Sequence, residues 1–370
     1  MGLFDIFKNN SNHDDESNAN LSNKQLLEKL EFRNKIIIKL EKDLDAKNKE
    51  IKELKEELEK VTSNKESNIY ASIEEKNKLE LQKPNTPVSN NEKQPEEDIN
   101  YDEMREKLLE AIKEKTKIKS YHITPTEITD GDIFISKFGG LGYWDKSMEY
   151  PKDSEGNDLV LLAQINFDKE KINNSNLPSK GLLQFYVLPD TFYGANFDNL
   201  NDKNTYKVIY HENVNYDVKR EDLSNIKTNL MLEKDDEYFP FDKEFKIEFE
   251  EMEDYISPVD YNFNEVLNNI VKEEFDIDVS NTPLYKVFGQ GIMDYLNDKL
   301  ISSGSKLLGY PYFTQTDPRE IDKYNKYKIL LFQMDSDSEV GIMWGDVGIA
   351  NFFITEDNNF EDILYTWDCT

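Results

Sequence analysis

The sequence predicts an α+β fold in which strands dominate: a two-lobed domain with an internal duplication and largely antiparallel sheets, preceded by a coiled-coil helix. Three observations predict it. A motif around Lys137 returns around Lys306. Short alternating apolar runs and turns fill the chain after residue 120, and apolar residues recur at heptad spacing before residue 63.

The duplication rests on two matches that share one offset. Ser136–Trp144 returns as Ser305–Phe313, and Val160–Asn166 returns as Ile329–Asp335, both 169 residues later. Chance explains two matches at one offset less readily than either match alone. We therefore predict two copies, at about 130–215 and 300–370, and expect functional residues where the copies face each other.

The chain before residue 100 is predicted to lie outside the folded core. Residues 1–20 are polar and rich in Asn, which is typical of a disordered arm. In residues 21–62, nine of the eleven a and d heptad positions are apolar, which predicts a self-associating coiled coil; a single charged helix is the alternative. Residues 63–99 are rich in Ser, Asn, Lys and Glu, which predicts a flexible linker to a globular domain at 100–370.

The globular domain is predicted to begin with a helix from Tyr101 to about Lys117, because its apolar residues share one face. Period-two alternation and helical spacing then mark the later elements in order. The expected strands are Ile133–Ile135, Leu159–Ile165, Leu182–Leu188, Tyr206–Tyr210, Phe245–Phe249, Ile329–Met334 and Ala350–Ile354, with helices at Val266–Phe275 and Ile292–Leu300.

An acidic insert at about 216–285 separates the two copies. From Glu233 to Asp278 the chain has seventeen acidic and four basic residues, with aromatic residues interleaved. Strand alternation places much of this charge on a solvated face. An acidic docking patch is the sharper hypothesis.

Composition narrows the set of partners. The 75 acidic and 45 basic residues give a net charge of −30, which argues against nucleic acid and favours a basic protein partner. The apolar runs are too short to span a membrane, so no stable membrane insertion is expected, and contact of the apolar N-terminal tip with a membrane surface stays open. The single cysteine, Cys369, suits a reducing compartment, and we expect a cytoplasmic protein.

Six short segments carry a family likeness. They are Ser136–Gly140, Leu162–Asn166, Gly181–Phe185, Lys306–Pro311, Trp344–Asp346 and Trp367–Cys369. In this order they resemble the YwqG family of uncharacterised bacterial proteins, over about residues 120–370. The resemblance implies an α+β domain in a family without an assigned reaction, some of whose relatives lie near toxin–immunity gene clusters. Gly142 departs from the family pattern, which has proline there; the second copy keeps Pro311.

Two glutamines are the first candidates for a site. Gln164 and Gln333 each interrupt an apolar run, and a buried amide needs partners, so each is a structural cross-link or a ligand contact. Gln184 and Asn351 form a looser second pair. A site between the copies would enclose both glutamines and place a lysine from each motif at its rim. The ligand-binding candidates are Gln164, Gln333, Lys137, Lys306, Trp344 and Asp346.

Neither a catalytic motif nor a cofactor motif is recognised in the chain. Asp335, Asp337 and Asp346 are spaced like the ligands of a calcium loop, but Val340 stands where that loop needs glycine. These three aspartates are therefore weak candidates for a cation site.

The function expected from these features is non-enzymatic: a protein-binding module presented on a dimeric coiled-coil stalk, with neutralisation of a toxin-like partner as one form. The alternative is an enzyme or a small-ligand sensor that uses the cleft between the two repeat lobes. A packed seam between the lobes favours the first function, and an open cleft favours the second.

Overall fold

The computed structural model describes residues 49, 52, 100–129, 131–233 and 237–370. The chain divides into two units, 1–96 and 97–370, and the fold below is that of the second unit. The predicted arm (1–20) and linker (63–99) lie outside the described residues, as does the coiled coil (21–62) apart from Lys49 and Lys52. All three stay predictions.

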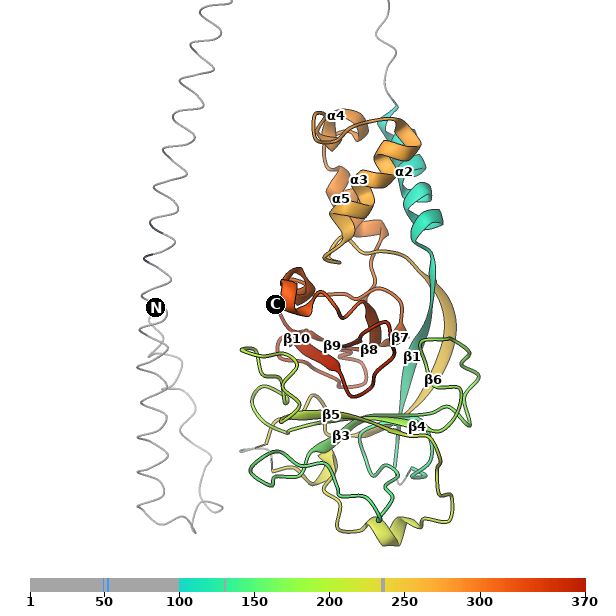
Figure 1. The fold of residues 1–370 in the computed structure, drawn as a ribbon, viewed down its shortest axis with the longest axis vertical. Coiled ribbons are helices and arrows are strands. Elements are labelled where there is room, and N and C mark those ends of the chain that lie inside the picture. The colour runs from blue at the N-terminus through green and yellow to red at the C-terminus, as the bar shows by residue number, and fades with distance from the viewer. Residues whose placement is uncertain (1–48, 50–51, 53–99, 130, 234–236) are drawn as a thin grey trace, which may run out of the picture. The chain divides into compact units, whose positions relative to one another are not determined.

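In the second unit, helix α2 is followed by strands β1–β6, helices α3–α5 and strands β7–β10 (Figure 1). The α-helices are α2 (Tyr101–Thr116), α3 (Phe263–Phe275), α4 (Leu284–Phe288) and α5 (Ile292–Lys299). The strands are β1 (Ile118–Ile128), β2 (Lys137–Phe138), β3 (Val160–Asn166), β4 (Leu182–Val187), β5 (Tyr206–His211), β6 (Glu244–Asp254), β7 (Lys306–Leu308), β8 (Ile329–Asp335), β9 (Ile349–Ile354) and β10 (Ile363–Asp368). Short 3-10 helices are η2 (Arg220–Leu223), η3 (Asn229–Met231), η4 (Pro318–Glu320) and η5 (Asp322–Tyr324).

The ten described strands form one sheet in the order β10-β9-β8-β7-β1-β6-β2-β3-β4-β5, and every described pairing is antiparallel. β1 and β6 pair along their full length at the centre, and in Figure 1 they run from the helices past both halves of the sheet. β1 adjoins the later strands β7–β10, and β6 adjoins the earlier strands β2–β5. The later half of the sheet is therefore joined to β1 from the start of the unit, whereas β6 follows β5 along the chain.

The sheet curls until its two edge strands meet. Tyr206 of β5 donates a hydrogen bond from its hydroxyl to the carbonyl of Ile363 in β10 (2.7 Å), and its ring lies 5.1 Å from that of Tyr365. The curl encloses a core of aromatic rings, so the architecture is a strand-rich, almost closed antiparallel barrel. A second apolar cluster holds α2, α3, α4 and α5 together beside the barrel.

The predicted helices and most predicted strands are confirmed, and their observed boundaries differ from the predicted ones by at most a few residues. Helix α2 begins where expected, because the side chain of Asn100 accepts a hydrogen bond from the backbone N–H of Glu103. The expected strand Ile133–Ile135 is wrong, since these residues form a turn. Their carbonyls at Ile133 and Ile135 point to the side chain of Gln164 instead of a neighbouring strand.

β1 was not predicted, and its sequence explains why. Pro125 interrupts it, and a proline normally argues against a central strand because it has no N–H to donate. β7 pairs only with Ser120–His122, so at Pro125 the strand needs a partner on the β6 side alone.

Candidate functional site

The two motif lysines are buried ion-pair partners. Lys137 donates from Nζ to Glu244 Oε1 (2.6 Å) and to the carbonyl of Leu141 (3.0 Å), and its side chain is fully buried. Lys306 donates to Asp254 Oδ2 (2.6 Å) and to the carbonyl of Ser302 (2.8 Å), again with no exposed surface. The expected position of both lysines at the rim of a cleft is therefore wrong. Burial lowers the pKa of both ammonium groups, and the paired carboxylates oppose this shift.

The two ion pairs cannot belong to one binding site. Glu244 and Asp254 are the first and last residues of β6, and ten residue steps along a strand span roughly 30 Å. β6 therefore anchors the first motif at one end and the second motif at the other.

A motif glycine makes room for each carboxylate. A Cβ atom on Gly140 would lie 2.3 Å from the side chain of Glu244, and one on Gly309 would lie 2.2 Å from Asp254 Oδ2. Both glycines also have positive φ, 66° and 85°. The lysine and the glycine three residues later thus form one structural unit in both motif segments, and the absence of a Cβ allows the buried pair to form.

The glutamines cross-link backbone segments. Gln164 donates from Nε2 to the carbonyls of Ile133 (2.9 Å) and Ile135 (2.8 Å), and its Oε1 accepts from Tyr143 N and Gln184 Nε2. Gln184 donates as well to the carbonyl of Tyr143 (2.7 Å). All the hydrogen-bonding capacity of the Gln164 amide is met by the protein.

The second segment repeats this arrangement. Gln333 donates to the carbonyls of Ser302 (2.9 Å) and Gly304 (2.7 Å) and accepts from Tyr312 N (2.8 Å). Asn351 donates to the carbonyl of Tyr312 (3.0 Å), as Gln184 does to that of Tyr143. Of the two alternatives left open by the sequence, these contacts match the structural cross-link.

The seam between the two halves of the sheet is packed with rings. Phe332 lies 5.9 Å from Phe138 and 4.8 Å from Phe185, and Phe185 lies 5.0 Å from Phe352, centroid to centroid. All four side chains are fully buried. The glutamines therefore do not face an open cleft between the two halves.

The three candidate cation ligands do not converge. Asp335 accepts a hydrogen bond from Gly304 N (2.7 Å), and Asp337 accepts from Glu339 N (3.0 Å). Asp346 is exposed farther along the connection between β8 and β9, nine residues after Asp337. Within the residues that the structure describes, no three His, Cys, Asp or Glu side chains are grouped so as to hold a metal ion.

Asp346 lies at a surface formed by four loops, and Trp344 is buried beneath it. We call this surface the four-loop face; its described residues are 189–201, 229–233 with 237–242, 341–348 and 366–370. Each loop contacts the next: Tyr238 N donates to the carbonyl of Pro189 (3.2 Å), and Met343 N donates to that of Pro240 (2.8 Å). The C-terminal segment closes the ring, since Thr370 N donates to the carbonyl of Asp346 (3.2 Å).

Aromatic side chains build this face from the inside outward. Trp344 is fully buried, with its ring 5.3 Å from Tyr193 and 6.3 Å from Trp367. Trp367 in turn contacts Phe197 (5.8 Å) and donates from Nε1 to the carbonyl of Phe192 (2.7 Å). The exposed large apolar side chains of the face are Phe192, Phe197, Leu230, Met231, Tyr238 and Val347, each more than two-fifths exposed.

The charged side chains of the face are acidic in its described residues, although Glu237 pairs with Lys227 just outside them. Its described residues include seven carboxylates and neither lysine nor arginine. Asp198, Glu233 and Asp346 are exposed among the apolar side chains. An apolar surface with an acidic rim is therefore present where residues 229–233 and 237–242 meet residues 341–348 and 366–370.

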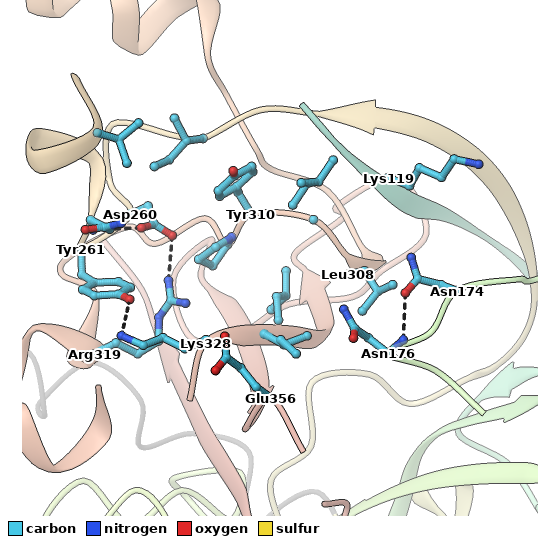
Figure 2. A pocket seen from close by; sticks show the side chains of 18 of the residues that line it. Lys119, Asn174, Asn176, Asp260, Tyr261, Leu308, Tyr310, Arg319, Lys328 and Glu356 are labelled. Atoms are coloured by element: carbon cyan, nitrogen blue, oxygen red, sulfur yellow. Dashed lines mark hydrogen bonds and ion pairs between the residues drawn. The ribbon is translucent and has the colours of Figure 1, made fainter. Parts of the chain in front are cut away.

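A separate pocket lies beside the helices (Figure 2). It has a volume of about 680 Å³ and is enclosed by the start of β1, the loop 174–176, the residues before α3, the end of β7 and the start of β8. Arg319 forms part of its wall and is almost fully buried. This pocket contains the glycine of the second motif, Gly309, but neither of the two glutamines.

Sequence reasoning missed the exposed aromatics and Arg319. Phe192 and Phe197 stand in a Gly- and Asn-rich loop, which reads as a simple connection. The one feature of the sequence that could have indicated their exposure is the presence of two phenylalanines in a polar segment. Arg319 gave no signal, since an arginine between Asp317 and Glu320 resembles an ordinary surface residue.

Comparison with known proteins identifies a family. A family model described as "Domain of unknown function (DUF1963)" matches residues 136–369. No curated protein matches the chain. Among the described residues, none of the helices has the length and apolar character needed to cross a membrane.

Proposed function

The chain belongs to the DUF1963 family, a domain of unknown function, and from that premise we propose that it is a non-enzymatic protein-binding module whose docking surface is the four-loop face. The partner is a basic protein surface that presents an apolar side chain. The observation that carries the proposal is the exposed aromatic cluster on loops whose described charged residues are all acidic.

Physical chemistry supports this choice of occupant. Aromatic side chains dominate the energetic centres of protein interfaces because they bury large areas with little loss of conformational entropy. A ring of carboxylates contributes orientation and a faster encounter with a basic partner. In a chain with net charge −30, an acidic partner would be repelled at long range.

The N-terminal segment completes the proposal. A dimeric coiled coil at 21–62 would present two copies of the face on a flexible linker, and the second contact would then form at a high effective concentration. The motifs that resemble the YwqG family suggest one biological form of this binding, the neutralisation of a toxin-like protein.

A peptide-display selection on the full-length chain tests the proposal. The enriched peptides should combine lysine or arginine with an aromatic or aliphatic anchor, and a synthetic copy should bind less tightly as salt is raised. The double variant Phe192→Ser/Phe197→Ser should weaken that peptide by at least about tenfold, the loss expected from two anchor side chains.

Tyr285→Ser is the matched control, because Tyr285 is exposed to a similar degree but lies on α4. It should leave peptide binding unchanged. Enrichment of acidic peptides, or equal binding by the double variant and the wild type, would rule the face out.

A further inference from the structure

We propose that the pocket beside α3 binds a small monoanionic organic carboxylate, held by Arg319 and Lys328. This inference is independent of the proposed protein-binding face, because the two surfaces share no residue.

Arg319 is held rigidly in the pocket wall. Its Nε bonds to Asp317 (3.0 Å), and its Nη2 bonds to Asp317 (2.6 Å) and Asp260 (2.8 Å). The rings of Tyr261 and Phe353 lie 4.7 Å and 4.4 Å from the guanidinium carbon. A group fixed by two carboxylates and two rings loses little conformational entropy when it binds a ligand.

One nitrogen of Arg319 is left for the pocket. Nη1 makes no hydrogen bond with any residue in the described part of the chain, whereas Nε and Nη2 are fully engaged. Figure 2 shows the guanidinium beside the cavity, with its bond to Asp260 on one side. An N–H of Nη1 can therefore donate a hydrogen bond to an anionic oxygen of a ligand.

Lys328 supplies the charge that favours an anion. Its Nζ donates to the hydroxyl of Tyr261 (2.8 Å) and to Asn325 Oδ1, and within the described residues no carboxylate lies in ion-pair distance of it. Lys119, also at the pocket, is already paired with Glu251 (2.8 Å). Of the lysines that line the pocket, Lys328 is therefore the one without a carboxylate partner among the described residues.

The carboxylates at the pocket oppose a second negative charge on the ligand. Asp260 and Asp317 both pair with Arg319, and Glu356 also lines the pocket. These three carboxylates would repel a phosphate dianion more strongly than a singly charged carboxylate, which can still accept hydrogen bonds from Arg319 and Lys328.

The rest of the lining fits an organic body. Leu308, Pro311 and Leu330 are apolar, and Asn174 and Asn176 lie across the cavity from Arg319 in Figure 2. The side-chain amide of Asn176 has no hydrogen-bond partner among the described residues, and Asn174 uses only Oδ1, which accepts from Asn176 N (2.9 Å). Apolar walls with a few polar groups are typical of small-molecule pockets.

Ligand-observed NMR with benzoate, benzamide and phenyl phosphate on the full-length chain tests the inference. Benzoate should bind saturably in the millimolar range, as expected for a fragment of this size, and its neutral analogue benzamide should not. Phenyl phosphate, a dianion near pH 7, should bind at least roughly fivefold more weakly than benzoate.

Three variants locate the site. Lys328→Ala should weaken benzoate roughly five- to tenfold, and Asn176→Trp, a surface change that narrows the cavity, should abolish binding. Lys207→Ala removes a lysine of β5 that does not line the pocket, and it should have no effect. Equal binding of benzamide, a preference for phenyl phosphate, no saturable benzoate binding, or an equal loss in Lys207→Ala would each overturn the inference.

Discussion

Gly309 decides whether the Lys306–Asp254 pair can form. The pair needs its carboxylate in the space that a Cβ on residue 309 would occupy, and the same holds for Gly140 and Glu244. A buried lysine without its partner would carry an uncompensated charge, which is far more costly than a surface ion pair. Each buried ion pair therefore requires a glycine beside its carboxylate.

Gly309→Ala should be more destabilising than Gly341→Ala, although both glycines have φ of 85°. A Cβ at Gly341 meets nothing within 4 Å, so that variant carries only the backbone strain of about 1–2 kcal/mol. Gly309→Ala should cost about 1–3 kcal/mol more, because the Cβ displaces Asp254. Urea unfolding of both variants measures the difference, and equal midpoints would contradict this account.

Asp335 supports a prediction about pH. Burial raises the pKa of its carboxyl above the ordinary value. The folded state then holds the proton more tightly than the unfolded state, so this group stabilises the fold below its unfolded pKa and loses that contribution as pH rises through the folded pKa.

The variant Asp335→Asn isolates this contribution. Its amide oxygen can still accept from Gly304 N, so wild type should lose stability relative to the variant as pH rises from about 4 to 7. Denaturant unfolding of both proteins across that pH range shows whether the stability of the wild type falls or rises relative to that of the variant. If the wild type instead became more stable relative to the variant as pH rises, the prediction would be contradicted. If the wild type became more stable on addition of calcium, the cation hypothesis would be supported again.

At the scale of elements, the amide side chains connect strands to loops. Gln164 in β3 bonds to the carbonyls of Ile133 and Ile135 and to the backbone of Tyr143, so it fixes a turn on either side of β2. Gln333 in β8 does the same around β7. β6 then joins the two halves, with one buried acid at each end.

Gln164→Leu should destabilise the domain by at least about 1–3 kcal/mol, the cost of leaving buried backbone groups without partners. Gln290→Leu is the control, because Gln290 is exposed and is not in a strand. Thermal or chemical unfolding compares the two. An unchanged stability of Gln164→Leu would remove the structural role of the amide and return it to the list of ligand contacts.

At the scale of the whole molecule, we expect folding and association to depend on different parts of the chain. The apolar core of the second unit lies entirely within 97–370, whereas the heptads lie in 21–62. A strongly negative chain resists non-specific association, so its oligomeric state should depend on the heptads.

The fragment 97–370 should fold as a monomer, and the full-length chain should be a dimer. Light scattering at matched concentrations gives both masses, and circular dichroism checks that the fragment retains its fold. A monomeric full-length chain would refute the predicted coiled coil, and a dimeric fragment would move the interface to the barrel.

The sequence by itself determined most of the local elements: three of the four described α-helices of the second unit, most of the strands, the paired motifs and the acidic insert. These follow from hydrophobic periodicity, turn residues and composition, which act between near neighbours. It also identified Gln164 and Gln333 correctly as buried amides that need partners, because a polar residue in an apolar strand signals this locally.

Only the tertiary structure decided what those residues contact. Lys137 and Lys306 appeared to be rim residues until β6 brought an acid to each, and the sheet order joins strands that are far apart in the chain. The four-loop face likewise gathers Phe192, Tyr238 and Trp367 from separate segments. Long-range strand pairing and the curl of the sheet create these neighbours, and burial then determines which charges and rings remain for a partner.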